Sequence, residues 1–311
     1  MGLTRTVITF FIVLIYLESS SLSFIMVIMC LYVYVCVGIT FTSLHPGLSN
    51  LLRCLLFLLV LIFFRTSRLI TFYLTFEFSL VPITLIILLL GYQPEKLSSS
   101  LYILIYTVLC SLPFFLFVVF SCCDIHSGLC SARPILSSVL SLAFMVKSPL
   151  YCLHSWLPKA HVEAPLLGSM LLSGVLLKIG GYGFIILMPG DTSVFHFYIY
   201  LSLLGGLVCS LLSFSAWDMK SVVAYSSILH IGVVTLGTLS GLERGYWVAS
   251  GMIIAHSLVS PILFSLSYLL YLSTSSRSFV HGLNSPCLSQ LSIILALYCG
   301  LNFGLPPSLP F

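Results

Sequence analysis

Long apolar segments, separated by short polar turns, follow one another along almost the whole of this 311-residue chain. A helix needs about 20 predominantly apolar residues to cross the hydrocarbon core of a bilayer. The stretch Val7–Leu17 is shorter, and we interpret it as a retained helix because a glutamate and a serine run follow it instead of a cleavage site. The segments long enough to span cover residues 22–43, 48–64, 69–91, 101–121, 135–157, 165–188, 195–216, 221–240, 246–272 and 287–305. The sequence therefore predicts an all-α, polytopic membrane bundle of ten or eleven spanning helices.

The composition agrees with this fold class and excludes several functions. Hydrophobic residues make up 59% of the chain and charged residues only 6%, whereas soluble domains carry about 25% charged residues. The net charge of +4 is scattered over short loops, so no basic cluster indicates nucleic-acid binding. Most of the 11 cysteines lie in apolar segments, and their spacing matches no zinc or iron–sulfur pattern.

Ionisable side chains inside the apolar segments are the main indication of function. A charge at membrane depth costs a few kcal/mol or more, so such residues are rare and usually line a polar path. A row of titratable groups through a helix bundle is what a proton path requires. The candidates for this row are Glu77, Lys147, Lys178, His230 and His256.

Each candidate also has a plainer interpretation. A lysine can extend its stem toward the membrane surface, a glutamate can lie near an interface, and a membrane histidine can be a packed hydrogen-bonding residue. Depth argues against the first two, because Glu77 lies about eight residues inside its segment and Lys147 stands near the middle of its own. A second group, His154, Lys159, His161 and Glu163, lies at a helix end and loop, where we expect solvated side chains.

Prolines at membrane depth predict broken helices. Pro149 follows Lys147 by two residues in the middle of an apolar segment, and a proline pair at 306–307 interrupts another. Proline removes a helical hydrogen bond, and broken helices in transporters often occupy corresponding positions in two inverted halves. We expect an interruption between Lys147 and Tyr151 that leaves carbonyl groups without their usual partners. An ordinary helix kink is the alternative.

Two geometric expectations follow from the cost of isolated charge in a membrane. Glu77 and Lys147 should face each other across neighbouring helices, since opposite charges stabilise each other there. Lys178, His230 and His256 should point into one shared interior rather than toward lipid. The loops that carry Lys96, Lys159 and Lys220 should lie on one side, which is slightly richer in basic residues and is assigned by the positive-inside rule to the matrix or cytoplasm.

Several motifs carry a resemblance to a known family. The run MVKSPLYCLHSWLPKAHVEAP at 145–165 strongly resembles the signature of the antiporter-like, proton-pumping subunits in the membrane arm of respiratory complex I, the mitochondrial NADH:ubiquinone oxidoreductase. Within that family, LPKAHVEAP with QPE and DMKS is similar to the chain 4 branch. Further matching runs are QPE at 93–95, GSM at 168–170, LLKIGGYG at 176–183, DMKSVVAYSSILH at 218–230 and IAHS at 254–257.

The resemblance implies roles for the five candidates. It implies a charge pair of Glu77 with Lys147, a proton carrier at Lys178 in the middle of the path, and a hydrated axis continued by His230 and His256. The resemblance also implies inverted antiporter-like repeats, with N-terminal membrane helices in 1–64, a first antiporter-like unit in 65–190 and an incomplete second unit in 191–311. Family members continue beyond the matching proline pair, so the sequence resembles one truncated at its C-terminal end, either a fragment or a short natural variant.

The family further implies how the chain works with others. It would act as a subunit of a proton-translocating NADH:ubiquinone reductase, in contact with other membrane-arm subunits and the lipid bilayer. Partner subunits would hold the FMN, the iron–sulfur clusters and the ubiquinone. This chain itself would bind no cofactor and no metal. Its location would be the mitochondrial inner membrane. Alternatives are a subunit of a multisubunit cation/proton antiporter and a structural spacer of the membrane arm.

Overall fold

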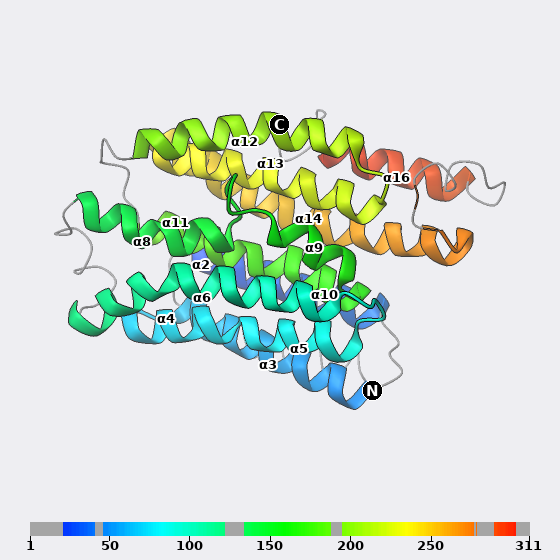
Figure 1. Cartoon of the computed structure of the whole chain (residues 1–311), viewed down its shortest axis with the longest axis horizontal. Helices are drawn as coiled ribbons and strands as arrows, with labels where there is room; N and C mark the ends of the chain where they lie inside the picture. The colour runs from blue at the N-terminus through cyan, green and yellow to red at the C-terminus, as the bar shows by residue number, and fades with distance from the viewer. Residues whose placement is uncertain are drawn as a thin grey trace.

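The computed structural model describes residues 21–40, 46–121, 134–187, 195–276, 278 and 289–302. Helices make up nearly all of this part of the chain, and their axes run roughly along one direction (Figure 1). In chain order the elements are α2 (Ser21–Thr40), α3 (Pro46–Arg65), α4 (Leu69–Phe78), α5 (Leu80–Leu90), α6 (Lys96–Ser121), α8 (Pro134–Lys147), α9 (Trp156–Glu163), α10 (Leu166–Leu171), the π-helix η1 (Leu172–Leu176), α11 (Leu177–Leu187), α12 (Phe195–Ser215), α13 (Met219–Leu239), α14 (Glu243–Thr274) and α16 (Ser289–Asn302).

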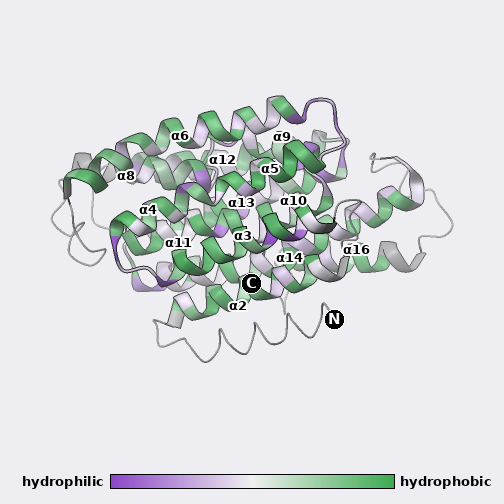
Figure 2. Ribbon diagram, turned by 90° about the horizontal axis from the view of Figure 1, so that it is seen from below, coloured by the Kyte–Doolittle hydropathy of each residue, from purple (hydrophilic) through white to green (hydrophobic). Residues whose placement is uncertain are grey.

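The helices have the length and polarity of membrane spans. Within the described residues, seven helical stretches are long and apolar enough to cross a bilayer, and two shorter apolar helices cover Leu22–Gly38 and Ile293–Asn302. Figure 2 shows apolar residues along almost every ribbon, with hydrophilic residues mainly near helix ends. The predicted all-α, polytopic membrane bundle is confirmed. The expected helix at Val7–Leu17 and the proline pair at 306–307 lie outside the described residues.

Three of the spans are interrupted, two of them at a proline and the third by a π-helix. Pro82 has no amide hydrogen for the carbonyl of Phe78, and the chain leaves regular helix at Ser79 between α4 and α5. Pro149 separates α8 from α9. The third interruption is η1, which widens the helix between α10 and α11 so that the amide of Leu177 reaches the carbonyl of Leu172, five residues back.

The α10–η1–α11 span forms the centre of the bundle. It contacts α2, α5, α8, α9, α13 and α14, and 89% of the residues in its most apolar stretch are buried. In helix α12, by contrast, only 17% of the residues in the corresponding stretch are buried, and large apolar side chains point outward. An ionisable residue on α11 is therefore surrounded by protein on all sides.

One end of the bundle gathers lysine side chains at helix termini, and we call it the lysine end. Lys96 Nζ donates to the carbonyl of Gly91 (3.1 Å), just after α5, and Lys220 Nζ donates to the carbonyl of Ala164 (2.8 Å), just after α9. A cation at the C-terminus of a helix satisfies free carbonyl groups and complements the helix dipole. A Cβ atom on Gly91 would lie 3.3 Å from the carbonyl oxygen of Glu163, so these contacts together place the starts of α6 and α13 at the same end as the last turn of α9.

Candidate functional site

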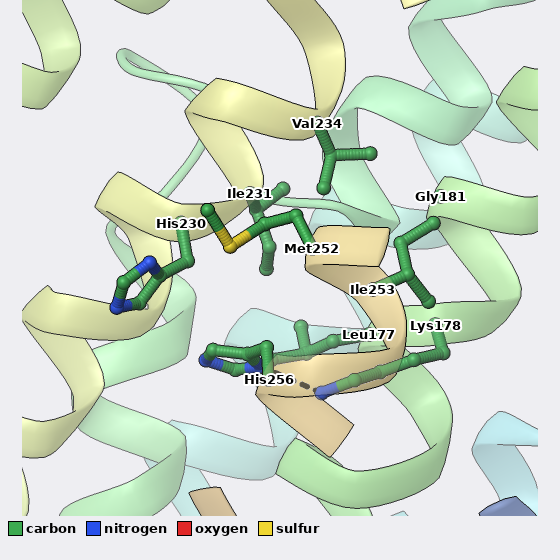
Figure 3. Close-up of a pocket in the computed structure, with 9 residues that line it drawn as sticks. All are labelled: Leu177, Lys178, Gly181, His230, Ile231, Val234, Met252, Ile253 and His256. Atoms are coloured by element: carbon green, nitrogen blue, oxygen red, sulfur yellow. Dashed lines mark hydrogen bonds between the residues drawn. The ribbon is translucent and has the colours of Figure 1, made fainter. Parts of the chain in front are cut away.

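Lys178 and His256 form a direct contact deep in the bundle. Lys178 lies in the first turn of α11 and His256 near the middle of α14, and the two side chains are 4% and 5% exposed. Lys178 Nζ lies 2.7 Å from His256 Nδ1 (Figure 3). The same ammonium also donates to the carbonyl of Ser173 in η1. The π-helix thus places a carbonyl acceptor beside the ammonium, at a depth where water is scarce.

His230 joins this pair from α13. Its ring centroid lies 5.4 Å from that of His256, and both rings border one cavity together with Lys178 (Figure 3). The cavity leaves about 10 Å³ for the centre of a water molecule, close to what one ordered water needs. Asn302 of α16 lies in the adjoining pocket and donates to Ser226 Oγ (3.2 Å). The structure therefore brings Lys178, His230 and His256 to one shared interior, as expected from the sequence.

Lys147 reaches across to α4 from the last turn of α8. Its ammonium, 2% exposed, donates to the carbonyl of Phe76 and lies 3.4 Å from both Ser79 Oγ and the centroid of the Phe76 ring. Glu77 is close enough for its negative charge to stabilise the ammonium of Lys147. The two residues make no direct ion pair, however, and Glu77 Oε1 has no hydrogen-bond partner among the described residues. Lys147 and Glu77 are electrostatic neighbours, and their functional pairing remains a prediction.

The break after Lys147 occurs where the proline pattern predicts it. Helix α8 ends at Lys147 and α9 begins at Trp156. The amide of Leu150 bonds to the carbonyl of Met145 (3.0 Å), one residue further back than in an α-helix, so the carbonyl of Val146 loses its helical partner. Trp156 Nε1 donates to that carbonyl instead, at 3.1 Å. An indole from the far side of the break therefore satisfies the backbone that Pro149 freed.

The break is packed directly against the helix that carries Lys178. A Cβ atom on Gly180 would lie 2.7 Å from the backbone nitrogen of Ser148 and 3.2 Å from Lys147 Cβ. Only glycine allows α11 to approach this closely. The two buried lysines thus belong to one packed unit, in which a movement of the break would reach α11.

The expectation that His154, Lys159, His161 and Glu163 form a solvated group is wrong for two of the four. Lys159 is exposed, but His161 is 0% and Glu163 8% exposed. The reason lies in the helical spacing of Trp156, Leu157, Ala160, His161 and Ala164, which places His161 on the buried face of α9. Other neighbours missed from the sequence are Ser79 beside Lys147 and Asn302 beside His230, and no pattern in the chain identified them.

Metal binding finds no support in the described part of the chain, where no three His, Cys, Asp or Glu side chains come together in a way that could hold an ion. An ammonium and two imidazoles around one small cavity are groups that can exchange protons.

Comparisons with known proteins give matches over most of the chain. A family model described as "NADH:quinone oxidoreductase/Mrp antiporter, TM" matches residues 66–311. Two curated relatives are named NADH-ubiquinone oxidoreductase chain 4. The protein from Artemia franciscana is 39% identical over 82% of this chain and 68% of its own length, and the one from Albinaria caerulea is 38% identical over 82% and 62%. The chain thus spans roughly two thirds of the length of these relatives.

Solved structures share the fold. A chain of respiratory complex I from Thermus thermophilus with bound NADH superposes with a TM-score of 0.79 at 25% identity, covering 92% of this chain and 64% of that one. A chain of the Mrp complex from Dietzia sp. superposes with a TM-score of 0.81 at 21% identity, covering 93% and 34%.

Proposed function

This chain belongs to the NADH:quinone oxidoreductase/Mrp antiporter family of membrane proteins, and on that premise we propose that it translocates protons as a membrane-arm subunit of respiratory complex I. The relatives named NADH-ubiquinone oxidoreductase chain 4, at 38–39% identity, agree with the branch that the sequence motifs indicated. The observation that carries the proposal is the buried contact between Lys178 and His256, which opens onto a cavity shared with His230.

The contact is suited to proton transfer. An ammonium 2.7 Å from an imidazole nitrogen is at hydrogen-bond distance, so one proton can pass from Lys178 Nζ to His256 Nδ1 without movement of heavy atoms. The products are a neutral amine and an imidazolium. His230 then lies within reach through a single water in the cavity.

Lys147 and Glu77 would control this transfer from the break. Opposite charges stabilise each other at membrane depth, so a change in the charge of Lys147 alters the balance of forces between α4 and α8. The break packs against α11 at Gly180, which gives that change a mechanical route to Lys178. In this proposal Lys178, His256 and His230 carry protons, and Glu77 with Lys147 sets when they move.

Partner subunits would supply the energy. We propose that this chain lies in the mitochondrial inner membrane beside other membrane-arm subunits, that the FMN, the iron–sulfur clusters and the ubiquinone belong to partners, and that it contributes no redox centre. The division into helices up to residue 64, a first antiporter-like unit in 65–190 and a second in 191–311 is part of the same proposal.

The alternatives are less well supported. The likeness to the Mrp complex, at 21% identity, concerns the fold alone, so a multisubunit antiporter would be supported only if the chain purified without flavin and iron–sulfur subunits. A structural spacer has no use for a buried lysine in contact with histidine, because a charge kept at that depth is costly.

The test is Lys178→Met in membranes that hold the intact assembly, with Lys159→Met as the matched control because Lys159 is exposed. The Lys178 variant should assemble but translocate severalfold fewer protons per NADH oxidised, since its side chain can no longer release a proton. The control should match the wild type. Unchanged proton translocation by an assembled Lys178→Met variant would contradict the proposed function.

A further inference from the structure

His161 is a fully buried titratable side chain that the proposed path does not use. It lies in the last turns of α9 with 0% of its surface exposed. Neither Nδ1 nor Nε2 has a hydrogen-bond partner among the described residues. The ring stacks flat on Phe264 of α14, with centroids 4.5 Å apart and planes 9° from parallel. Packing explains the stack, but it does not explain why a ring with two polar nitrogens occupies the position.

The position lies between the lysine end and the Lys178–His256 pair. His161 is close enough to Lys220 and to Lys178 for electrostatic interaction with both ammonium groups. The Lys220 ammonium also bonds to the carbonyl at the C-terminus of α9. His161 is likewise close enough to His256 for electrostatic interaction between the two rings. Phe264 follows His256 by eight residues on α14, about 12 Å at 1.5 Å per residue, in the direction of the lysine end. His161 is therefore a polar group on the route from that end to the centre.

Buried polar atoms nearly always have a partner, either protein or ordered water. Two nitrogens on opposite sides of one imidazole call for two partners. We propose that His161 is a proton relay with one water bound at each ring nitrogen, linking the lysine end to the Lys178–His256 pair, an inference that rests on the proposed proton-translocating function. One nitrogen takes a proton from the water on the lysine side, and the other releases its proton to the water on the inner side. Once the second proton has left, the ring is neutral in its other tautomer, and a turn of the ring brings the bare nitrogen back to the lysine side.

Titratable groups lie on both sides of this relay. Glu163 follows His161 by two residues in α9 and is itself buried, and Lys220 stands at the start of α13. Acidic and basic groups therefore meet at the lysine end. Lys178 and His256 stand on the inner side. A passive packing residue here would need neither nitrogen.

The variants separate relay from packing. In membranes with the intact assembly, His161→Phe keeps a flat ring on Phe264 but removes both nitrogens, and His161→Gln keeps a polar group that cannot titrate. Both should lower proton translocation per NADH oxidised severalfold, to the level of Lys178→Met, because a positioned proton-transfer group contributes about a hundredfold or more to its own step. In His161→Ala, added imidazole should restore part of the loss. His196→Phe is the matched control, since His196 is exposed on α12, and it should behave as wild type.

A packing role predicts different results. His161→Phe would then translocate protons normally, and imidazole would restore nothing in His161→Ala; either result overturns the relay. If these variants do not assemble, a density map of the wild-type assembly that resolves ordered water decides, because a ring nitrogen without a water or protein partner refutes the proposal.

Failure of the relay is distinguishable from failure of the proposed function. Lys178→Met with lost translocation, beside a fully active His161→Phe, removes only the relay. Unchanged translocation in both variants removes the proposed function as well.

Discussion

The indole of Trp156 is expected to stabilise the break in the α8–α9 span, and the strength of that effect can be worked out from the structure. Trp156 Nε1 donates to the carbonyl of Val146 at 3.1 Å, and the indole side chain is 2% exposed. Replacing Trp156 by Phe leaves that carbonyl unsatisfied. An unsatisfied buried group costs about 1–3 kcal/mol, and hydrogen bonds between membrane helices have coupling energies of about 0.6–1.7 kcal/mol. We expect a loss of about 1–2 kcal/mol in the free energy of unfolding, including a smaller contribution from the lost ring volume.

A double-mutant cycle isolates the hydrogen bond from the volume. In Pro149→Ala, residue 149 regains an amide that can bond to the carbonyl of Met145, which releases the amide of Leu150 for Val146. The indole then becomes redundant, so Trp156→Phe should cost only its volume contribution in this background. The coupling between the two changes should be about 1 kcal/mol.

The measurement is detergent-induced unfolding of the full chain in mixed micelles, followed by circular dichroism. Trp247→Phe serves as the control, since Trp247 is 72% exposed on α14 and the same substitution should have little effect there. Equal losses for Trp156→Phe and Trp247→Phe, or a Trp156→Phe loss that persists unchanged beside Pro149→Ala, would refute the reasoning.

Two further substitutions test the packing around the site. Gly180→Ala should force α11 away from the break and cost about 1–3 kcal/mol in unfolding, because the new Cβ would lie 2.7 Å from Ser148 N, whereas Gly206→Ala has nothing within 4 Å and should be neutral. A neutral Gly180→Ala would contradict the close approach. Asn302→Ala should lower proton translocation while leaving the fold intact, since Asn302 lies beside His230 and donates to Ser226; wild-type translocation would limit Asn302 to a packing role.

Much of the fold was predictable because a bilayer leaves few choices. A membrane span must satisfy its own backbone, so apolar length alone located most helices, and Pro149 located the break. The detail of each interruption was not predictable in the same way. The π-helix η1 contains no proline, and its effect on Lys178 depends on how the neighbouring helices pack.

The site was predictable only where depth was the signal. Lys178, His230 and His256 stand in the middle of apolar segments, and the structure brings them together. His161 was misjudged because its group was assigned to a helix end and loop, although the helical spacing of Trp156, Leu157, Ala160 and Ala164 already indicated a buried face. Contacts such as Asn302 with Ser226 join positions 76 residues apart, and a single sequence contains no measure of such proximity.

The lining of the central cavity has a consequence for ion selectivity. Its nine residues offer an ammonium, two imidazoles and otherwise glycine and apolar side chains (Figure 3), so none of the lining side chains carries the oxygen atoms that replace the hydration shell of an alkali cation. Room for about one water excludes a cation that keeps its own shell. A sodium ion would therefore have to shed its water beside a positively charged lysine without oxygen ligands from the lining side chains, whereas a proton moves by exchange along hydrogen bonds. Discrimination against sodium by charge and desolvation is built into the lining itself.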